Sequence, residues 1–326
     1  MEESHIDLSK IFNQLKDETF SKAFPIDGKV FLLSLSGGAD SVFLFHFLCF
    51  LKENHDFTFE AIHFNHNLRD KESDQDEAFC RKLCNDFFVP LYVKHFTFDK
   101  IKNLQDSARK ARYKSLKKYL SQKENAFLLT AHHLDDSLES FLIGLHQGRL
   151  DSRILSLNKL QLSHKILRPL VSLKKEMIVS YLNESNLIYR TDSSNLDIKY
   201  LRNFYRESSI MKYSDDLFKI QNYLTEVEES KKNLFLAMLS GKTINDSNFK
   251  IKKEDIKSYS ITFKKEFFYY IIQKNFVKFM AKLDVKRIEQ LFNINRFGKK
   301  TFILSKYENK KLCVIEYSKK YEILVD

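Results

Sequence analysis

The pattern that most constrains this chain is the alternation of short apolar runs with amphipathic segments through its first two thirds. Lys29–Leu35 carries an unbroken apolar run, which is typical of a strand covered on both faces. Further strands are predicted over Phe57–Phe64, Leu91–Phe96, Ala126–Ala131 and Lys165–Leu170, with helices between them. This spacing predicts an α/β fold, a doubly wound parallel sheet of about five strands that binds ligands at the carboxyl ends of its strands.

The pattern changes after about residue 212. Helices are predicted over Asp216–Leu239 and Lys264–Phe279, and the apolar runs Thr301–Tyr307 and Leu312–Tyr317 have the turn content of a β-hairpin between them. We therefore expect two domains, residues 1–212 and residues 213–326. The second is predicted to be smaller, mainly helical, and to end in the hairpin.

The basic charge is concentrated in the second domain. Residues 213–326 carry 23 Lys and Arg against 15 Asp and Glu, a net charge of +8 out of +11 for the whole chain. This distribution favours a polyanionic partner such as a nucleic acid for the C-terminal part, although a lysine-rich stretch is also typical of a solvated surface.

Composition excludes several other classes of protein. The chain has 43% hydrophobic residues but no apolar run of 18, and its first residues lack the basic start and apolar core of a signal peptide. We expect a cytoplasmic protein that does not bind membranes. The four cysteines contain no CxxC pair, so buried structural thiols are favoured over a metal or cluster site: Cys49, Cys80, Cys84 and Cys313.

The segment between the first predicted strand and helix has the sequence SGGADS. At that position exposed backbone amides and the positive end of a helix dipole can hold a phosphate chain. Glycine allows close approach, and serine hydroxyls add donors. The carboxylate of Asp40 would repel phosphates unless a divalent cation such as Mg²⁺ lay between them. An ordinary glycine turn is the alternative. The residues predicted to bind nucleotide phosphates are Ser36, Gly37, Gly38, Ala39, Asp40 and Ser41.

An acidic helix is predicted after the fourth strand. Asp136 and Glu139 are three residues apart and share a helix face, where two carboxylates could hold and deprotonate an incoming ammonium group. His132 and His133 could instead form a metal site with Asp135, but no third ligand at metal spacing is evident. A helix dipole that favours acids at its start would explain Asp135 alone.

Several basic side chains could contact phosphates. Arg109 and Arg112 lie one helical turn apart, and Arg112 is the stronger candidate. Arg202 and Arg206 have i, i+4 spacing near the domain junction, which suits a phosphate clamp as well as an ion pair with a neighbouring acid. His63, at the end of the second strand, is placed to contact the adenine or ribose of a nucleotide or to serve as a structural histidine.

These motifs together resemble a known family. SGGADS is similar to the pyrophosphate loop (PP-loop) of enzymes that attack the α-phosphate of ATP. Six further motifs are similar in order and spacing to tRNA(Ile)-lysidine synthetases: Ile62–Arg69, Ala108–Tyr113, Thr130–Glu139, Arg168–Leu170, Asp192–Asn195 and Arg202–Arg206. The C-terminal hairpin resembles the first C-terminal subdomain of that family, which makes this chain a short form without the second.

The resemblance implies a PP-loop fold of the adenine nucleotide hydrolase type and an ATP-dependent ligase. Its substrates would be ATP with Mg²⁺, L-lysine and a tRNA(Ile) with a CAU anticodon. The wobble cytidine would be adenylated at its C2 oxygen with release of pyrophosphate, and the lysine amine would then displace AMP, changing codon reading from AUG to AUA. Residues 1–212 would be catalytic and residues 213–326 would bind tRNA. Catalytic roles would fall to Asp40, Arg112, His132, Asp136 and Glu139, and substrate contacts to Arg202 and Arg206.

This sequence departs from the family pattern in places. Gly148–Ile154 retains one glycine of a glycine-rich stretch, Gln105 replaces a glutamate, Ser137 replaces a glutamine, and Met211–Lys212 replaces a proline. Two alternatives therefore stay open. One is a tRNA thiolation enzyme of the same superfamily, which the cysteine usage disfavours. The other is a non-catalytic tRNA-binding protein. The oligomeric state is also open, with a homodimer as one candidate.

Overall fold

The computed structural model describes residues 8–21, 24–65, 71–96, 104–148, 160–161, 165–191, 204–205, 208–240, 248–293, 300–308 and 310–325. The chain divides into two compact units, residues 1–225 and 226–326, and each is described by itself. The division falls within helix α9 (Ser214–Leu239), whereas the sequence places the domain boundary before that helix. The first turns of α9 belong to the first unit because Gln221 is buried and bonded to Ser137.

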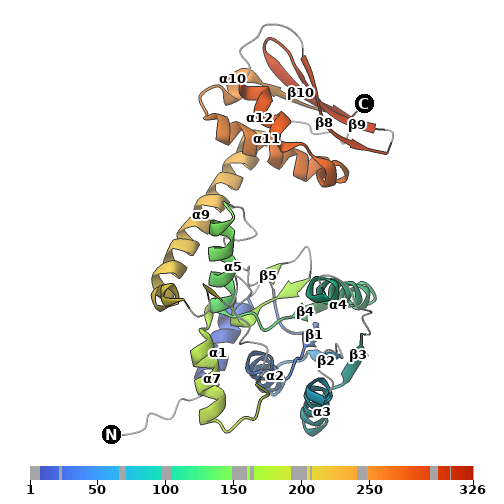
Figure 1. The fold of residues 1–326 in the computed structure, drawn as a ribbon, viewed down its shortest axis with the longest axis vertical. Coiled ribbons are helices and arrows are strands. Elements are labelled where there is room, and N and C mark those ends of the chain that lie inside the picture. Colours follow the sequence, from blue (N-terminus) through green and yellow to red (C-terminus); the bar gives the residue numbers. More distant parts are fainter. Residues whose placement is uncertain are drawn as a thin grey trace. The chain divides into compact units, whose positions relative to one another are not determined.

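The first unit is built on a six-stranded sheet in the order β3-β2-β1-β4-β6-β5 (Figure 1). Its strands are β1 (Val30–Ser34), β2 (Thr58–Asn65), β3 (Leu91–His95), β4 (Ala126–Leu129), β5 (Leu160–Gln161) and β6 (Ile166–Leu167). Five strands run parallel, and the two-residue edge strand β5 is antiparallel to β6. The prediction of a doubly wound parallel sheet of about five strands is confirmed.

Helices cover both faces of this sheet. They are α1 (Leu8–Thr19), α2 (Ala39–Lys52), α3 (Lys71–Asp86), α4 (Leu104–Ser121), α5 (Leu134–His146) and α7 (Lys175–Glu184), with 3₁₀ turns η2 (Pro169–Ser172) and η4 (Ser209–Tyr213). Phe31 and Leu33 of β1 join a core with α1, α2, α3 and α7, whereas Leu32 between them joins a second core with α4. Because successive side chains of a strand point to opposite faces, burial on both sides explains the unbroken apolar run.

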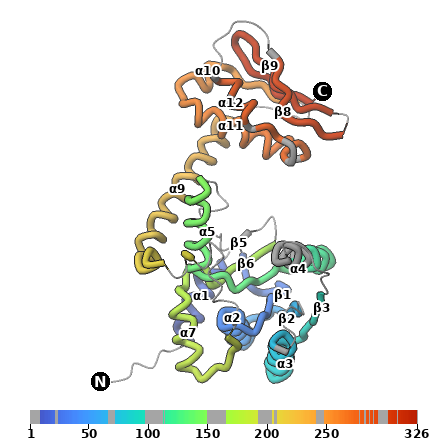
Figure 2. The backbone as a smooth tube through the Cα atoms, in the orientation of Figure 1, coloured from blue at the N-terminus to red at the C-terminus, as the bar shows by residue number. Residues whose placement is uncertain are grey.

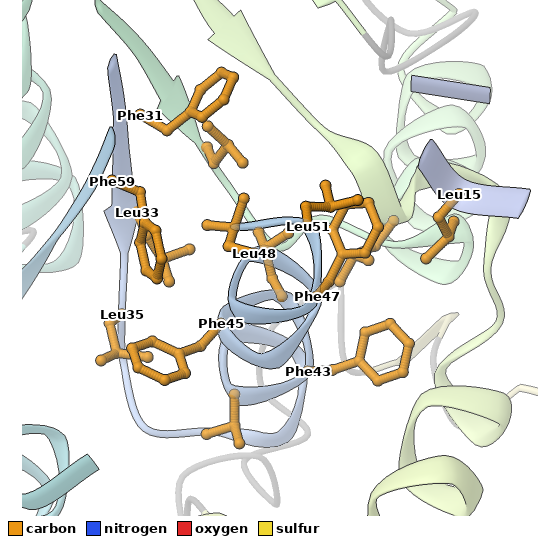
Figure 3. Close-up of a cluster of buried hydrophobic side chains, with 14 of the residues drawn as sticks. Leu15, Phe31, Leu33, Leu35, Phe43, Phe45, Phe47, Leu48, Leu51 and Phe59 are labelled. Atoms are coloured by element: carbon orange, nitrogen blue, oxygen red, sulfur yellow. The ribbon is translucent and has the colours of Figure 1, made fainter. Parts of the chain in front are cut away.

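Helix α2 is apolar around most of its circumference because it is enclosed. Figure 3 shows Phe43, Phe45 and Phe47 pointing from this helix into the surrounding core. Phe43 meets Phe12 of α1 edge-on at 5.3 Å and stacks on Tyr181 of α7 at 6.0 Å, both between ring centroids. All three phenylalanines are at most 1% exposed. The helix is therefore fixed between the sheet and two other helices.

The second unit has its own core. Its elements are β7 (Asn248–Lys252), α10 (Lys253–Ile256), α11 (Ile261–Asn275), η5 (Val277–Lys282), α12 (Val285–Asn293), β8 (Lys300–Tyr307), β9 (Lys310–Glu316) and β10 (Lys320–Val325). The predicted hairpin is β8–β9, and it belongs to a four-stranded antiparallel sheet in the order β7-β10-β9-β8. Phe267, Phe268 and Ile271 of α11 pack in one cluster with the sheet residues Val314 and Ile323.

No helix in the described part of the chain is long and apolar enough to cross a membrane.

We expect Phe47→Ala to lower the free energy of unfolding by about 3–5 kcal/mol, because it opens a cavity in a closed core. Phe88→Ala is the matched control: Phe88 is 91% exposed, and its removal should change the free energy by less than about 0.5 kcal/mol. Urea denaturation of both variants measures the difference. Equal losses in the two variants would contradict the enclosure of α2.

Candidate active site

The sheet places two loops beside each other at its carboxyl edge. The chain runs from β1 through α2 to β2 and through α3 to β3 (blue to cyan in Figure 2), and then crosses back to β4 on the other side of β1. The strand order therefore reverses between β1 and β4. Loops that follow such a pair of strands frame the ligand crevice of doubly wound sheets. Here they are residues 35–38 after β1 and residues 130–133 after β4.

The loop after β1 is organised around the hydroxyl of Ser41. Its Oγ accepts hydrogen bonds from the backbone N–H of Ser36 and of Gly37, both at 3.2 Å, and donates to the carbonyl of Gly38 at 3.0 Å. Gly37 has a φ of 89°, a conformation that favours glycine. Gly38 caps α2, and Ala39 begins it. The amides of Ser36 and Gly37 therefore converge on Ser41 Oγ next to the amino end of α2, where a helix can bind a phosphate group.

His63 supports this loop from β2. Its Nδ1 lies 2.9 Å from the carbonyl oxygen of Leu35, one residue before Ser36. The side chain is 4% exposed, and burial lowers the pKa of His63 below its ordinary value. The geometry thus gives His63 a structural contact, and its predicted contact with adenine or ribose stays a prediction.

The loop after β4 brings an acidic cluster to Asp40. His133 Nε2 lies 3.8 Å from Asp40 Oδ2 and 3.4 Å from Asp136 Oδ2, and His133 Nδ1 lies 3.3 Å from Asp135 Oδ2. Lys175, the first residue of α7, places Nζ 2.5 Å from Asp40 Oδ1. Its backbone N–H donates to Asp135 Oδ2 at 2.8 Å. Three carboxylates thus converge on the imidazole of His133, and one of them, that of Asp40, also pairs with the ammonium group of Lys175.

The environment sets the charges of this cluster. Burial would lower the pKa of His133, but the carboxylates of Asp135, Asp136 and Asp40 outweigh it and raise the pKa above 6.5. Burial would likewise raise the pKa of Asp135, yet the interaction with His133 and the bond from the Lys175 amide lower it. The surroundings therefore favour the protonated, cationic form of the His133 imidazole.

The predicted acid pair is only partly accessible. Asp136 Oδ2 accepts a hydrogen bond from the backbone N–H of His133 at 3.1 Å, which caps α5, and its side chain is 16% exposed. Glu139, one turn further along α5, is fully buried. His132 places Nδ1 2.9 Å from Thr130 Oγ1. The contacts of the carboxylates described above are made by His133.

Sequence reasoning missed Lys175 and gave His133 no role beyond a metal site with Asp135. A lysine at the start of a predicted helix carries no distinctive signal, since lysines are common there on solvated surfaces. Lys175 follows β6 and begins α7. Its ion pair with Asp40, 135 residues away in sequence, comes from the fold and has no local signal.

Arg112 lies at the same edge of the sheet. Its guanidinium carbon is 5.9 Å from the ring centre of Phe64, near the end of β2, and the side chain is half-buried. Arg109 belongs to the same helix, α4. Several predicted residues lie outside the described residues: His66, Asp192–Asn195, Arg202 and Arg206, and residues 149–154 of the altered glycine loop.

The carboxylates near residues 36–41 could supply only part of a Mg²⁺ coordination shell. Within the described residues no group of three or more His, Cys, Asp or Glu is arranged to hold a metal ion. Mg²⁺ commonly takes one or two carboxylates and completes its shell with water and substrate phosphates. The carboxylate of Asp40, next to the loop of residues 36–38, could supply one such ligand if Mg²⁺ took the place of Lys175 Nζ at Oδ1.

A family profile for the PP-loop domain matches residues 6–213, the whole segment that carries the loop and the acidic cluster. The chain belongs to the PP-loop family. Residues 36–41 lie within the matched segment, and their assignment as the PP-loop stays a prediction.

Individual relatives are also similar. The tRNA(Ile)-lysidine synthase of Buchnera aphidicola subsp. Baizongia pistaciae is 33% identical over 246 residues, which cover 70% of this chain and 55% of that protein. The enzyme of the same name from Haemophilus influenzae KW20 is 35% identical over 208 residues, covering 61% and 45%. The chain thus spans about half the length of these relatives.

Among solved structures, the U34-tRNA thiolase NcsA from Methanococcus maripaludis with its [4Fe-4S] cluster matches with a TM-score of 0.57 at 18% identity. The match covers 67% of this chain and 78% of that protein. At this identity the likeness concerns the fold of the PP-loop unit alone.

We expect the imidazole of His133 to titrate above pH 6.5. A histidine with a raised folded-state pKa stabilises the fold fully below its unfolded-state pKa, and that contribution is lost as the pH rises through the folded-state pKa. Asp135→Asn keeps an acceptor for the Lys175 amide but removes a charge, so it should shift the midpoint downward. NMR titration of the His133 imidazole resonance measures the midpoint in the wild type and in the variant. A wild-type midpoint at or below pH 6.5 would contradict a raised pKa of His133.

Proposed function

We propose that this chain is a tRNA(Ile)-lysidine synthase, an ATP-dependent ligase that joins L-lysine to C2 of the wobble cytidine in a tRNA(Ile) with a CAU anticodon. The observation that carries the proposal is the juxtaposition of the PP-loop with a cluster of carboxylates through His133. A loop that binds ATP phosphates and an acidic site that holds an amine are what adenylation followed by amine attack requires. The named relatives support the same reading.

In the first step the C2 oxygen of cytidine attacks the α-phosphate and pyrophosphate leaves. The amino end of α2 would bind the phosphates, and the amides of Ser36–Gly38 would exchange their hydrogen bonds to Ser41 Oγ and Ser36 Oγ for bonds to phosphate oxygens. Lys175 and Arg112 would supply positive charge at the same edge. Mg²⁺ held by Asp40 would neutralise charge on the departing pyrophosphate. Lys175 is the first residue of α7 and its ammonium group pairs with Asp40, so this charge lies beside the loop.

In the second step the ε-amine of lysine attacks C2 and AMP leaves. The amine arrives as an ammonium ion and must lose a proton before it can attack. Asp136 is the more exposed of the two predicted acids and would receive the ammonium, while Glu139, fully buried one turn further along α5, would support it from the same helix face. The imidazole of His133, 3.4 Å from Asp136 Oδ2, lies on the same carboxylate.

The second unit would bind the tRNA. The net charge of +8 in residues 213–326 supports contacts to phosphates, whose affinity falls steeply with salt. Arg202 and Arg206 are proposed to add phosphate contacts at the junction. The assignment of residues 1–212 as catalytic and 213–326 as tRNA-binding is part of this proposal, as is a cytoplasmic location.

Thiolation of tRNA is the alternative within the superfamily, and the cysteines argue against it. Cys80, Cys84 and Cys313 are buried, and burial raises the pKa of Cys84 to about 12. Burial raises the pKa of Cys80 as well, and that of Cys49 to about 12. Thiols that stay protonated at neutral pH are poor nucleophiles and poor cluster ligands.

We expect wild-type protein to incorporate labelled lysine into a CAU-anticodon tRNA(Ile) in the presence of ATP, and Asp40→Ala to reduce the rate by about 100-fold or more. Asp86→Ala, an exposed acid at the end of α3, is the matched control and should keep wild-type activity. Transfer of sulfur instead of lysine would favour the thiolase. No tRNA-dependent exchange between ATP and pyrophosphate would favour a non-catalytic tRNA-binding protein.

Asp136→Asn should separate the two steps. The amide can still accept the capping bond from His133 but no longer attracts an ammonium ion, so the KM for lysine should rise about tenfold or more. Exchange between ATP and pyrophosphate does not need lysine and should stay within about threefold of wild type. Steady-state kinetics and exchange assays measure the two effects, and an equal loss in both would place Asp136 in adenylation.

A further inference from the structure

Arg190 contacts the PP-loop from a segment that follows α7. Its backbone N–H donates to the carbonyl of Gly37 at 2.9 Å, and Gly38 forms a parallel β-bridge with Arg190. This contact joins residues 37 and 190, which lie far apart in sequence. The chain then continues directly toward the predicted Asp192–Asn195 motif.

The side chain of Arg190 also packs on the loop. A Cβ added at Gly37 would lie 3.5 Å from Arg190 Cγ, 3.3 Å from Phe79 Cδ1 and 3.4 Å from Cys80 Sγ. Gly37 is thus enclosed between the stem of Arg190 and helix α3. Its left-handed conformation and this close approach both require glycine.

The guanidinium group ties the loop to α3. Arg190 Nε donates to Asp76 Oδ1 at 2.9 Å, and Nη2 donates to Gln75 Oε1 at 2.8 Å. Arg190 and Asp76 are each 35% exposed in their side chains. Because Asp76 already pairs with its charge, Arg190 is suited to hold position rather than to bind phosphate.

The direction of the Gly37 carbonyl determines what the loop presents. In a trans peptide the C=O of one residue and the N–H of the next point in opposite directions. The carbonyl of Gly37 points to Arg190, so the N–H of Gly38 points the other way, where it lies 3.3 Å from Ser36 Oγ inside the loop. Fixing the carbonyl therefore fixes one of the amides proposed to bind phosphate.

We propose that Arg190 is a positioning residue for ATP: it clamps the peptide between Gly37 and Gly38 against α3, so that the Gly38 amide keeps the direction in which it can exchange Ser36 Oγ for a phosphate oxygen. The inference rests on the proposed use of ATP by this loop. The bound guanidinium keeps residue 190 beside the loop, and a loop displaced by about 1 Å loses binding and rate by one to two orders of magnitude.

The test compares Arg190→Ala and Arg190→Lys with wild type. Arg190→Ala should raise the KM for ATP, and the dissociation constant for ATP with Mg²⁺, by about tenfold. The KM for lysine and for tRNA should stay within about twofold. Lysine keeps the stem over Gly37 but offers a single donor group, so Arg190→Lys should raise the KM for ATP by only about threefold.

Arg81→Ala is the matched control, because Arg81 forms an ion pair of similar length with Glu77 on the same helix. It should leave all three KM values unchanged. If Arg190→Ala does not fold, Asp76→Asn weakens the anchor with Arg190 in place and should raise the KM for ATP by about threefold. A purely structural role would lower the melting temperature without a selective change in the KM for ATP, and that result would overturn the inference.

Two outcomes separate this inference from the proposed function. Wild-type protein that binds ATP, with binding weakened by Asp40→Ala but not by Arg190→Ala, would overturn the role of Arg190 alone. Wild-type protein that does not bind ATP would overturn the role of Arg190 together with the proposed function.

Discussion

The enclosure of α2 is the constraint on which the first unit depends. A helix that buries phenylalanines against the sheet, α1 and α7 cannot rotate or slide without opening the core. Its amino end is therefore fixed at the carboxyl edge of β1, and the loop that precedes it inherits that position. The proposed binding of phosphates at this edge needs a loop that is held in one position. The apolar packing of α2 provides that rigidity.

Hydrogen bonds hold the loop before α2 in addition to the apolar packing of the helix. Two contacts hold the loop: the ring of His63 with the Leu35 carbonyl, and the backbone N–H of Arg190 with the Gly37 carbonyl. On the opposite side, Asp135 accepts the first amide of α7 and so directs Lys175 toward Asp40. Asp135 and Asp136 thus cap helices and also lie next to His133. A substitution of either residue changes the helix cap and the local charge together.

Much of the fold could be predicted from the sequence because strands buried on both faces leave unbroken apolar runs, as Lys29–Leu35 does. The loop of residues 36–41 was equally evident, since its glycines and serines fall between a strand and a helix. β7 escaped prediction as a strand of the second sheet. Asn248–Lys252 alternates apolar and lysine side chains as a half-buried strand does, but it pairs with β10, far along the chain, and no neighbouring strand in the sequence pointed to it. Lys175 and Arg190 escaped because their importance comes from pairing with the loop across more than 130 residues.

Ser137 illustrates a limit of comparing sequences one position at a time. The family resemblance leads one to expect a glutamine there, and the serine counts as a departure. In the fold, its hydroxyl is bonded to the carboxamide of Gln221, which is buried and comes from α9. A carboxamide is therefore present beside residue 137 although another helix contributes it. A substitution at position 137 therefore has to be judged together with the side chain at position 221, which completes its surroundings.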